Sequence, residues 1–493
     1  MDIEARRLAI EASQKFYYVN ITEERFGAKV TNTAVQNDVA IQAAINEVED
    51  GGGGCVIIPA GAFQINEIKI TKPYVTIDGT GILINGRIVV GGENVPTDLY
   101  FKIRNIDIRR DVLAEGTTGI EFYNARIGEV TGVTFRNIDK PLYFRPITSE
   151  YFHQSDNIKM DNNMFKACNY CLYVDRPETP TKIYQVGDIT FTRNCGFDIQ
   201  IKHAHILGVD GLKFDDNVLF FPGNATKNQT KEQNLYVDVG NFIGISGNQF
   251  FEAGYEGIVL SRCRNFTISN NRIPWSGQRN PSDAIRIMGG DQNGQIYNVG
   301  TIGFNQIEYP TRHGISIEGN CGYITVGSGN TIRSVGNPYG YYGTVDLNSI
   351  PHHAVTCEVT CQFVFVQGNN CPDNTFRLLG GNNIAVNNLE AGRVFRNSYY
   401  ILSLQGTETT AEVGKFDGID LAQSNPTTIT SFSGGFNGKE ITCLSYNGNT
   451  TFAHGLGSAQ FCLKSRVNAT PPAHGTITFK FLNSRWYEIS RNF

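Results

Sequence analysis

The chain has 493 residues, 53 of them glycine, with 18% charged residues and a formal net charge of −5. This slightly acidic balance excludes the basic surface that nucleic-acid binding needs, and no apolar run reaches the roughly 18 residues that a membrane helix needs. The eleven cysteines are odd in number and lack a second half-site at zinc-finger spacing. We therefore expect buried free thiols, no metal site and synthesis in a reducing cytoplasm.

Residues 3–15 are helix formers with a partial apolar stripe, and the start of the chain lacks the apolar core of a signal peptide. A short, detached amphipathic helix is marginal by itself. We therefore expect residues 1–25 to form a helical neck that packs against copies of itself. A frayed terminus is the alternative.

Residues 26–65 predict a helix followed by the first strands. Asn37 or Asp38 is placed to cap the helix, Ala40–Val48 carry an apolar face at helical spacing, and Gly51–Gly54 end it. The strands that follow are expected at Cys55–Pro59 and Ala62–Ile65. An open stack of strands exposes unpaired backbone at its end, so a helix that covers this end is physically reasonable.

One short phrase returns between residues 130 and 335: an alternating apolar triplet, two polar residues, an asparagine and another apolar residue. Its asparagines are Asn163, Asn194, Asn217, Asn248, Asn271, Asn305 and Asn330. Self-similarity at a period of roughly 23–34 residues predicts a solenoid, and the alternation makes its unit a strand. Asparagine tolerates the left-handed conformation that a sharp bend between strands needs. The sequence therefore predicts an all-β fold, a parallel β-helix.

The entry segment resembles that of the pectate-lyase-like right-handed β-helix superfamily. The shared features are the F-G-A start at Phe26, the A-I-Q-x-A-I helix, the glycine run and the P-x-G strand end at Pro59. Val30-Thr-Asn-Thr stands where that superfamily has an Asp-Gly-rich turn. The resemblance implies a right-handed parallel β-helix over residues 26–395, and it is specific for the fold rather than for an activity.

From about residue 395 the periodicity breaks, and residues 435–455 and 475–493 predict hairpin-forming strands with Asn-Gly turns. This ending resembles the terminal domains of bacteriophage tailspikes and related depolymerases. The resemblance implies a C-terminal antiparallel β domain at 396–493 that caps the β-helix and holds a parallel homotrimer. It also implies a place in the virion, in the phage tail, with attachment to other virion proteins through an N-terminal region that is missing from this sequence.

A second strand aligns in each coil, and its outward residues form two columns. The strands are expected at 119–123, 141–145, 171–175, 198–202, 234–238, 257–261, 284–288 and 314–318, with Ile120, Leu142, Ile258 and Leu260 pointing inward. One column is Glu121, Tyr143, Tyr173, Gln200, Tyr236, Val259, Arg286 and Ser316. The other is Tyr123, Arg145, Asp175, Lys202, Asp238, Ser261, Met288 and Glu318.

The content of these columns predicts a carbohydrate-binding groove. Tyrosine rings can lie against the C–H face of a sugar, and charged side chains can grip its hydroxyls or carboxylates. The predicted substrate-binding residues are Tyr143, Arg145, Tyr173, Lys202, Tyr236 and Arg286, joined by Trp275 and Arg279 from an insertion at 274–282. Insertions at 148–156 and 222–233 lengthen the same edge. The alternatives are an ordinary solvated face, because tyrosine favours strands, and simple loop packing for Trp275.

Cleavage of a glycosidic bond needs an acid together with a base or nucleophile. Asp175 and Asp238 lie two coils apart in one column, which puts about 10 Å between their backbones. Glu256 and Asp283 share a register on consecutive coils about 5 Å apart, so one of the two pKa values should be raised. Both pairs are candidates, with Glu252 as a third choice. A ladder along the turn edge is the alternative for the second pair.

A lyase would instead need a base against an acidic sugar, and Lys202, Arg145, Arg286 or His313 could serve. No dense Asp cluster indicates calcium. We therefore expect a phage tailspike depolymerase that binds a bacterial surface polysaccharide, either capsule or O-antigen, and hydrolyses it without a cofactor. A polysaccharide lyase and a receptor-binding spike that does not cleave are the alternatives.

Overall fold

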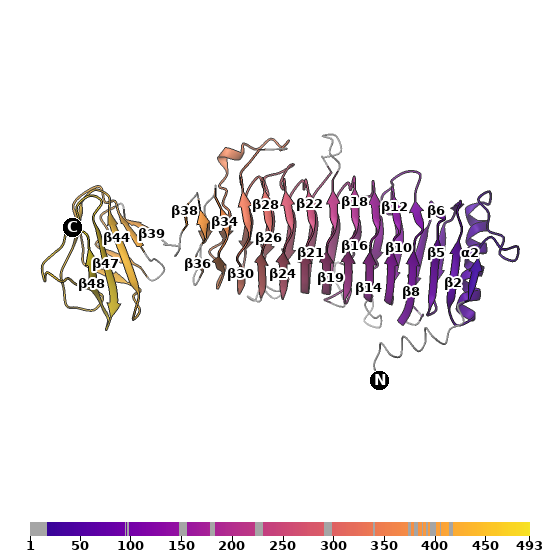
Figure 1. The fold of residues 1–493 in the computed structure, drawn as a ribbon, viewed down its shortest axis with the longest axis horizontal. Helices are drawn as coiled ribbons and strands as arrows, with labels where there is room; N and C mark the ends of the chain where they lie inside the picture. The colour runs from indigo at the N-terminus through magenta and orange to yellow at the C-terminus, as the bar shows by residue number, and fades with distance from the viewer. Residues whose placement is uncertain are drawn as a thin grey trace. The chain divides into compact units, whose positions relative to one another are not determined.

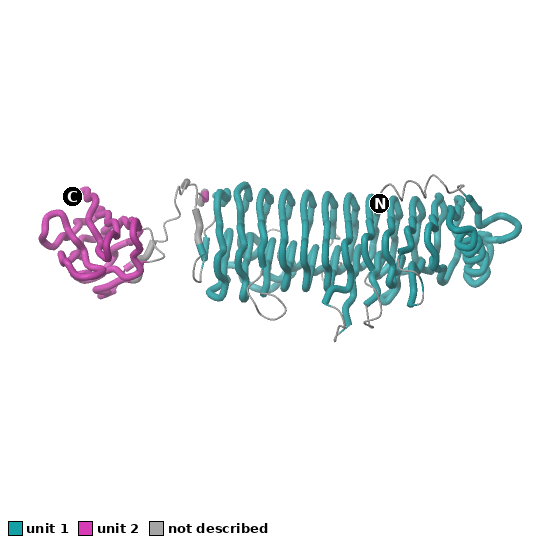
Figure 2. The backbone as a smooth tube through the Cα atoms, turned by 90° about the horizontal axis from the view of Figure 1, so that it is seen from below, with its two compact units in different colours: residues 1–384, 389–393 teal, residues 385–388, 394–493 magenta. Residues whose placement is uncertain are grey.

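The computed structural model describes residues 17–493 except 94, 96–97, 147–154, 178–182, 222–229, 290–297, 339–340, 373–375, 379–382, 387, 391–392, 395–400, 405 and 414–417. Two compact units divide the chain, one of residues 1–384 with 389–393 and the other of 385–388 with 394–493 (Figure 2). Of the helical neck expected at 1–25, residues 1–16 lie outside the described residues, and Tyr18–Asn20 form a strand that pairs in parallel with Cys55–Ile57 and not a helix. None of the helices in the described residues combines the length and apolar character that a membrane crossing requires.

The first unit is a right-handed parallel β-helix whose coils stack side by side (Figure 1). Each coil contributes strands to two long parallel sheets, in the order first sheet, second sheet, first sheet. The first sheet contains β1 (Tyr18–Asn20), β2 (Gly54–Ile58), β4 (Glu67–Ile70), β5 (Val75–Gly79), β7 (Arg87–Gly91), β8 (Asp98–Arg104), β10 (Thr118–Tyr123), β11 (Arg126–Thr131), β13 (Lys140–Phe144), β14 (Asp156–Asp161), β16 (Leu172–Val174), β17 (Ile189–Thr192), β19 (Ala204–Asp215), β21 (Leu235–Ser246), β23 (Ile258–Ser261), β24 (Phe266–Ser269), β26 (Ile285–Met288), β27 (Gly300–Gly303), β29 (Ile315–Glu318), β30 (Ile324–Val326), β32 (Val355–Cys357), β33 (Phe365–Gln367), β35 (Phe376–Leu378) and β36 (Ile384–Val386). The second contains β3 (Ala62–Gln64), β6 (Ile82–Ile84), β9 (Asp107–Arg109), β12 (Thr134–Arg136), β15 (Met164–Lys166), β18 (Cys195–Phe197), β20 (Val218–Phe220), β22 (Gln249–Phe251), β25 (Arg272–Pro274), β28 (Gln306–Glu308), β31 (Thr331–Arg333), β34 (Asn370–Cys371), β37 (Leu389–Glu390) and β38 (Arg393–Val394).

The asparagines of the repeat form one hydrogen-bonded ladder inside the β-helix. Asn217 shows the pattern: its backbone N–H donates to Asn248 Oδ1 at 3.0 Å, and its Nδ2 donates to the same oxygen at 2.9 Å and to Phe191 O at 3.0 Å. The ladder runs through Asn163, Asn194, Asn217, Asn248, Asn271, Asn305 and Asn330, and it extends to Asn369. These side chains are buried, so each amide supplies hydrogen bonds that water cannot reach.

The reason that the sequence suggested for these asparagines is wrong. The residue with positive φ at each bend is the one before the ladder asparagine. Examples are Asn162 (55°), Arg193 (53°) and Asp216 (56°). The repeated asparagine is therefore required for its side-chain amide, and the left-handed bend accepts several residue types.

Helix α2 (Ala34–Asp50) covers the first coils, and it begins earlier than the sequence indicated. Thr33 is the N-cap in place of Asn37 or Asp38, because Thr33 and Gln36 form a reciprocal capping box. Asp38 accepts hydrogen bonds from the backbone and side chain of Asn66, which ties the helix to the strands beneath it. The helix ends at Gly51, as expected.

The core of the β-helix is made of stacked apolar columns. The residues expected to point inward, Ile120, Leu142, Ile258 and Leu260, are fully buried. Phenylalanine rings also stack from coil to coil, with Phe191 and Phe214 5.0 Å apart between ring centroids. All eleven cysteines are free, and nine of them are buried.

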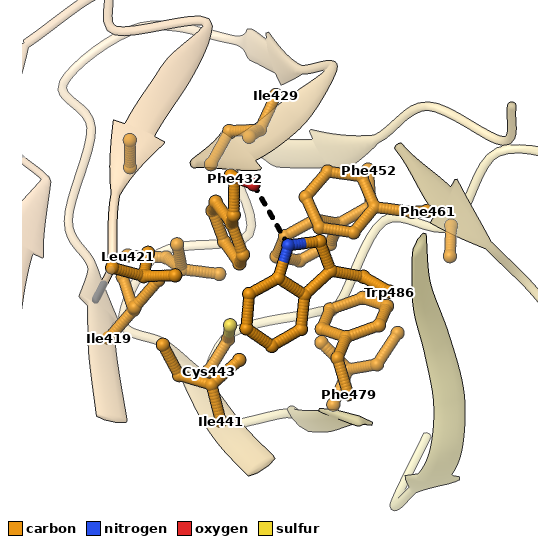
Figure 3. Packing of buried hydrophobic residues seen from close by; sticks show 14 of the residues in the cluster. Ile419, Leu421, Ile429, Phe432, Ile441, Cys443, Phe452, Phe461, Phe479 and Trp486 are labelled. Atoms are coloured by element: carbon orange, nitrogen blue, oxygen red, sulfur yellow. Dashed lines mark hydrogen bonds between the residues drawn. The ribbon is translucent and has the colours of Figure 1, made fainter. Parts of the chain in front are cut away.

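The second unit mixes parallel and antiparallel pairing. Its strands are β39 (Ile401–Leu404), β40 (Thr410–Glu412), β41 (Gly418–Leu421), β42 (Thr427–Ile429), β43 (Ser431–Ser433), β44 (Glu440–Ser445), β45 (Thr450–Phe452), β46 (Phe461–Cys462), β47 (Thr476–Leu482) and β48 (Arg485–Arg491). The antiparallel part is β44–β47–β48, where β47 and β48 form the hairpin expected near the end. The Asn447-Gly448 turn joins no hairpin, because β45 pairs in parallel with β42. Trp486 lies at the centre of this core and donates its Nε1–H to Phe432 O at 2.9 Å (Figure 3).

Removal of one ladder amide should destabilise the protein strongly. In Asn248→Ala, the N–H and Nδ2 of Asn217 lose their acceptor and three carbonyl-type acceptors lose a donor. Buried unsatisfied groups cost about 1–3 kcal/mol each, so we expect a loss of about 3 kcal/mol or more. Asn46→Ala on the exposed side of α2 is the control, expected within about 0.5 kcal/mol of wild type. Equal thermal unfolding midpoints for the two variants would contradict this role of the ladder.

Candidate functional site

The outer surface of β13, β16, β23, β26 and β29, together with the first halves of β19 and β21, carries the predicted columns. We call this surface the tyrosine face. Its first column runs in strict register as Glu121, Tyr143, Tyr173, His205, Tyr236, Val259, Arg286 and Ser316. Successive members lie on neighbouring coils, about 4.8 Å apart.

One predicted strand of this face is wrong. Residues 198–202 form a turn, and the strand β19 begins at Ala204, so His205 takes the column position assigned to Gln200. The N–H groups of Gln200 and Ile201 donate to Cys168 O and Asn169 O of the preceding coil. The apolar and polar residues at 198–202 alternate as in a strand, but the backbone of these residues forms a turn. Lys202 therefore stands before the strand, and Leu207 takes its place in the second column.

Four rings stack along the first column as an aromatic ladder. The centroid distances are 6.1 Å from Tyr143 to Tyr173, 4.8 Å from Tyr173 to His205 and 5.4 Å from His205 to Tyr236. All four side chains are half-buried, and the faces of the inner rings are covered by their neighbours in the ladder. Burial raises the pKa of Tyr173 to about 12 and lowers the pKa of His205 to about 3. The ladder is therefore uncharged at neutral pH, which suits contact with the apolar face of a sugar.

Asp175 and Asp238 occupy the second column two coils apart, as expected, with Leu207 between them. Asp175 accepts a hydrogen bond from the Tyr143 hydroxyl at 3.1 Å. Both oxygens of Asp238 accept hydrogen bonds from Arg262, one of them at 2.9 Å from Nε. Asp238 is thus held by a guanidinium on the next coil, which makes it a weaker candidate for proton transfer than its position alone indicated.

Glu256 and Asp283 occupy the same position before β23 and β26, and the structure joins them to a larger group. Arg286 donates to Glu256 Oε1 at 3.2 Å and to Glu318 Oε2 at 2.6 Å. Arg312 donates to Glu318 Oε1 at 3.0 Å and, from Nε, to Asp283 Oδ1 at 2.8 Å. We call these three carboxylates and two arginines the charge cluster. Each carboxylate contacts at least one guanidinium, and the group carries one excess negative charge when all are ionised.

Two carboxyl groups of the charge cluster are shifted in opposite directions. Burial raises the pKa of Asp283 to about 6, although hydrogen bonds from Arg312 and from the His313 N–H oppose the shift. Burial acts in the same sense on Glu318, but hydrogen bonds from Ser316 and Arg286 outweigh it and hold the pKa of Glu318 below its usual value. Asp283 is fully buried, whereas 17% of the Glu318 side chain is exposed. The carboxylate of Glu318 can therefore contact a bound molecule, whereas the carboxylate of Asp283 is buried beneath the surface.

The other predicted site residues lie around these columns. Arg145 follows β13 in register with Tyr123, and its guanidinium lies 4.4 Å from the centroid of that ring. Trp275 follows β25 of the second sheet, 6.3 Å from the Phe251 ring, and Arg279 lies over Tyr255 at 5.5 Å. Both belong to the turn between β25 and β26, outside the two columns. Residues 147–154 and 222–229, which hold most of the two other insertions, lie outside the described residues.

The structure adds residues that the sequence did not single out. His205 was missed because of the false strand, although its place two residues before Leu207 in an alternating run was a usable signal. Glu318 was placed in a column but not considered as a catalytic residue. Arg312 could not be found by pattern, because it reaches Asp283 from the turn before β29. Among the residues that the structure describes, no group of His, Cys, Asp and Glu side chains is arranged to hold a metal ion.

No family model and no curated protein matches this sequence. The A-module of mannuronan C-5 epimerase AlgE4 from Azotobacter vinelandii is similar in structure, with a TM-score of 0.50 and 14% identity over 75% of this chain and 100% of that chain. A DFA-IIIase from Arthrobacter chlorophenolicus matches with a TM-score of 0.44 and 12% identity over 75% and 91%. An exopolygalacturonase from Thermotoga maritima matches with a TM-score of 0.36 and 12% identity over 77% and 93%. Likeness at such identity shows the fold, and the epimerase module agrees with the β-helix implied by residues 26–65.

The pH dependence of stability tests the environment of Asp283. Its pKa is about 6 in the folded protein against an ordinary value of 3.8, so its stabilising contribution is full below pH 3.8 and is lost as the pH rises through about 6. We expect the Tm of wild type to fall relative to that of Asp283→Asn across this window, and the difference to level off above it. Scanning calorimetry in a buffer series measures this difference. Parallel profiles for the two proteins would contradict the assignment.

Proposed function

We propose that this protein binds a polysaccharide along the tyrosine face and cleaves it by glycoside hydrolysis at the charge cluster. The observation that carries the proposal is the presence, on one rigid face, of an aromatic ladder and of two carboxylates, the buried Glu256 and the partly exposed Glu318, bridged by Arg286. The name of the epimerase module agrees with a polysaccharide ligand, while its likeness contributes the fold alone.

The aromatic ladder supports binding of an extended glycan. Four coils span roughly 14 Å, and the neutral, half-buried rings present apolar surface along that length. Each ring is pinned by its neighbours and, for Tyr143, by its hydrogen bond to Asp175. Little side-chain entropy is lost when a sugar lies on rings that are already fixed.

The charge cluster supports hydrolysis by a pair of carboxyl groups. One guanidinium contacts both Glu256 and Glu318, so their oxygens lie no further apart than Arg286 can bridge, which does not exceed the roughly 9.5 Å upper separation of glycosidase carboxyl pairs. In our proposal Glu318, whose pKa is held low, takes the proton of the attacking water. Glu256, which occupies the same position on the coil before Asp283, donates a proton to the leaving oxygen.

A lyase reaction is the second candidate, and His313 is the observation that favours it. Burial lowers the pKa of His313 to about 3, so its imidazole is neutral and can accept a proton at neutral pH. Arg286 could then neutralise the carboxylate of an acidic sugar. Hydrolysis is preferred because His313 Nδ1 already accepts the N–H of His353 at 2.9 Å.

The biological setting that we propose is that of a bacteriophage tailspike, a homotrimer in the virion that degrades capsule or O-antigen. Its support is the resemblance of the end of the chain to tailspike terminal domains. Sedimentation analysis of the full chain measures the oligomeric state, and a monomer at micromolar concentration would count against this setting.

Product analysis separates the three activities. The protein is incubated with purified capsular and O-antigen polysaccharides, and new reducing ends and the ultraviolet absorbance of unsaturated sugars are followed. Reducing ends without absorbance indicate hydrolysis, and both signals together indicate a lyase. Binding without either signal indicates a receptor-binding spike.

Substitution of the carboxyl pair tests the assignment of roles. We expect Glu256→Gln and Glu318→Gln each to lower kcat by about 10²–10⁴-fold, the usual contribution of a general acid or base, without loss of glycan affinity. Asp238→Asn should retain most activity, because Asp238 lies opposite Ser261, outside the charge cluster. Glu67→Gln is the matched control, since Glu67 forms the same kind of ion pair with Arg87 on an early coil. Full activity in both Glu256→Gln and Glu318→Gln would rule out this catalytic pair.

A further inference from the structure

Lys140 places its ammonium group among the tyrosine rings at one end of the aromatic ladder. Its Nζ lies 4.1 Å from the centroid of the Tyr173 ring and 5.1 Å from that of Tyr143. The ring of Tyr170 meets Tyr173 edge-on at 4.7 Å and closes one side of this position. Within the described part of the chain, no carboxylate lies at ion-pair distance from this ammonium.

The other cations of the tyrosine face are already neutralised. Lys202 contacts Glu232 at 2.9 Å, and Arg145 contacts Glu121 at 3.5 Å. The arginines Arg262, Arg286 and Arg312 are all paired with carboxylates. Lys140 differs from these cations, because its neighbours are aromatic rings, whereas each of the other cations has a carboxylate partner.

The surroundings of Lys140 attract its charge but leave its hydrogen-bonding capacity unused. A ring face stabilises a cation through its quadrupole, yet it offers no lone pair to the three N–H donors of an ammonium. The side chain is half-buried, so the local dielectric is lower than in water and an anion placed there would interact more strongly than at an open surface. The position is suited to an oxygen anion that reaches it from the solvent side.

We propose that the polysaccharide is acidic and that Lys140 binds a carboxylate carried by one of its sugars, while that sugar packs against the exposed parts of Tyr143 and Tyr173. This inference rests on the proposed function and narrows its substrate to a glycan that contains carboxylate sugars. A carboxylate supplies two acceptors and a full charge, and such charge-assisted hydrogen bonds are about twice as strong as neutral ones. A neutral hydroxyl would merely replace water.

Lys202 provides a matched control for Lys140. Lys140 is the first residue of β13 and Lys202 precedes β19, and both lie over a tyrosine ring, in the case of Lys202 that of Tyr236 at 5.2 Å. The difference between them is the partner, because Glu232 already occupies the Lys202 ammonium. A glycan carboxylate should therefore depend on Lys140 much more than on Lys202.

The test uses an array of purified bacterial capsular and O-antigen polysaccharides of known composition, each in native form and after chemical reduction of its carboxyl groups to hydroxyls. Wild type, Lys140→Gln and Lys202→Gln are compared, with circular dichroism and Tm as checks of folding. We expect the best ligand to contain carboxylate sugars. Lys140→Gln should weaken its Kd by about tenfold or more, as for loss of a charge-assisted hydrogen bond, and Lys202→Gln by less than about threefold.

Carboxyl reduction gives a second measurement that does not depend on a variant. Reduction of the best ligand should weaken its binding to wild type as much as Lys140→Gln does, and it should remove the difference between wild type and that variant. If the best ligand contains no carboxylate sugars, the inference is overturned while the proposed function stands. The same holds if Lys140→Gln weakens the binding of the native and of the reduced glycan equally. Binding to none of the glycans counts against the proposed function itself, and this inference falls with it.

Discussion

The asparagine ladder is the constraint on which the rest of this structure depends. Each coil of the central β-helix offers one buried amide that accepts from the coil before it and donates to the coil after it and to the backbone. A slip of one residue would break these bonds and turn every outward side chain of the coil inward. Unsatisfied buried amides are costly, so the ladder selects one register among the many that parallel strands of similar composition would otherwise allow.

A fixed register converts sequence positions far apart into neighbours at a regular spacing. Tyr143, Tyr173, His205 and Tyr236 are separated by about thirty residues each, and they stack because their coils are aligned. The charge cluster arises in the same way from three consecutive coils, those of β23, β26 and β29. In it, two guanidinium groups are shared among three carboxylates, so no buried charge is left without a partner. The face is rigid because the surrounding solenoid is rigid, which suits a ligand that must be held across several coils.

The sequence was informative wherever a local pattern repeated. The repeated asparagine and the alternating triplets predicted the parallel β-helix, and the inward residues of the second strand are buried as expected. The pattern failed at residues 198–202, where a turn has the alternation of a strand. It also failed at the helix cap, because Thr33 and Gln36 form the capping box while Asn37 and Asp38 accept hydrogen bonds from Lys29 and Asn66 instead. The pattern also gave the wrong reason for the repeated asparagines. A left-handed bend and a buried hydrogen-bonding position both favour asparagine, so the pattern could not tell which of the two requires it.

The sequence by itself determined that strands of similar length would stack in parallel, and that tyrosines and carboxylates would line one outer face. Both follow from periodicity, which is a local property of the chain. Only the tertiary structure decided which carboxylate meets which arginine, that Asp283 is buried behind Glu318, and that Lys140 lies among rings without a carboxylate partner in the described residues. These outcomes depend on the angles and lengths of side chains that reach across coils, and a one-dimensional pattern contains no information about that reach.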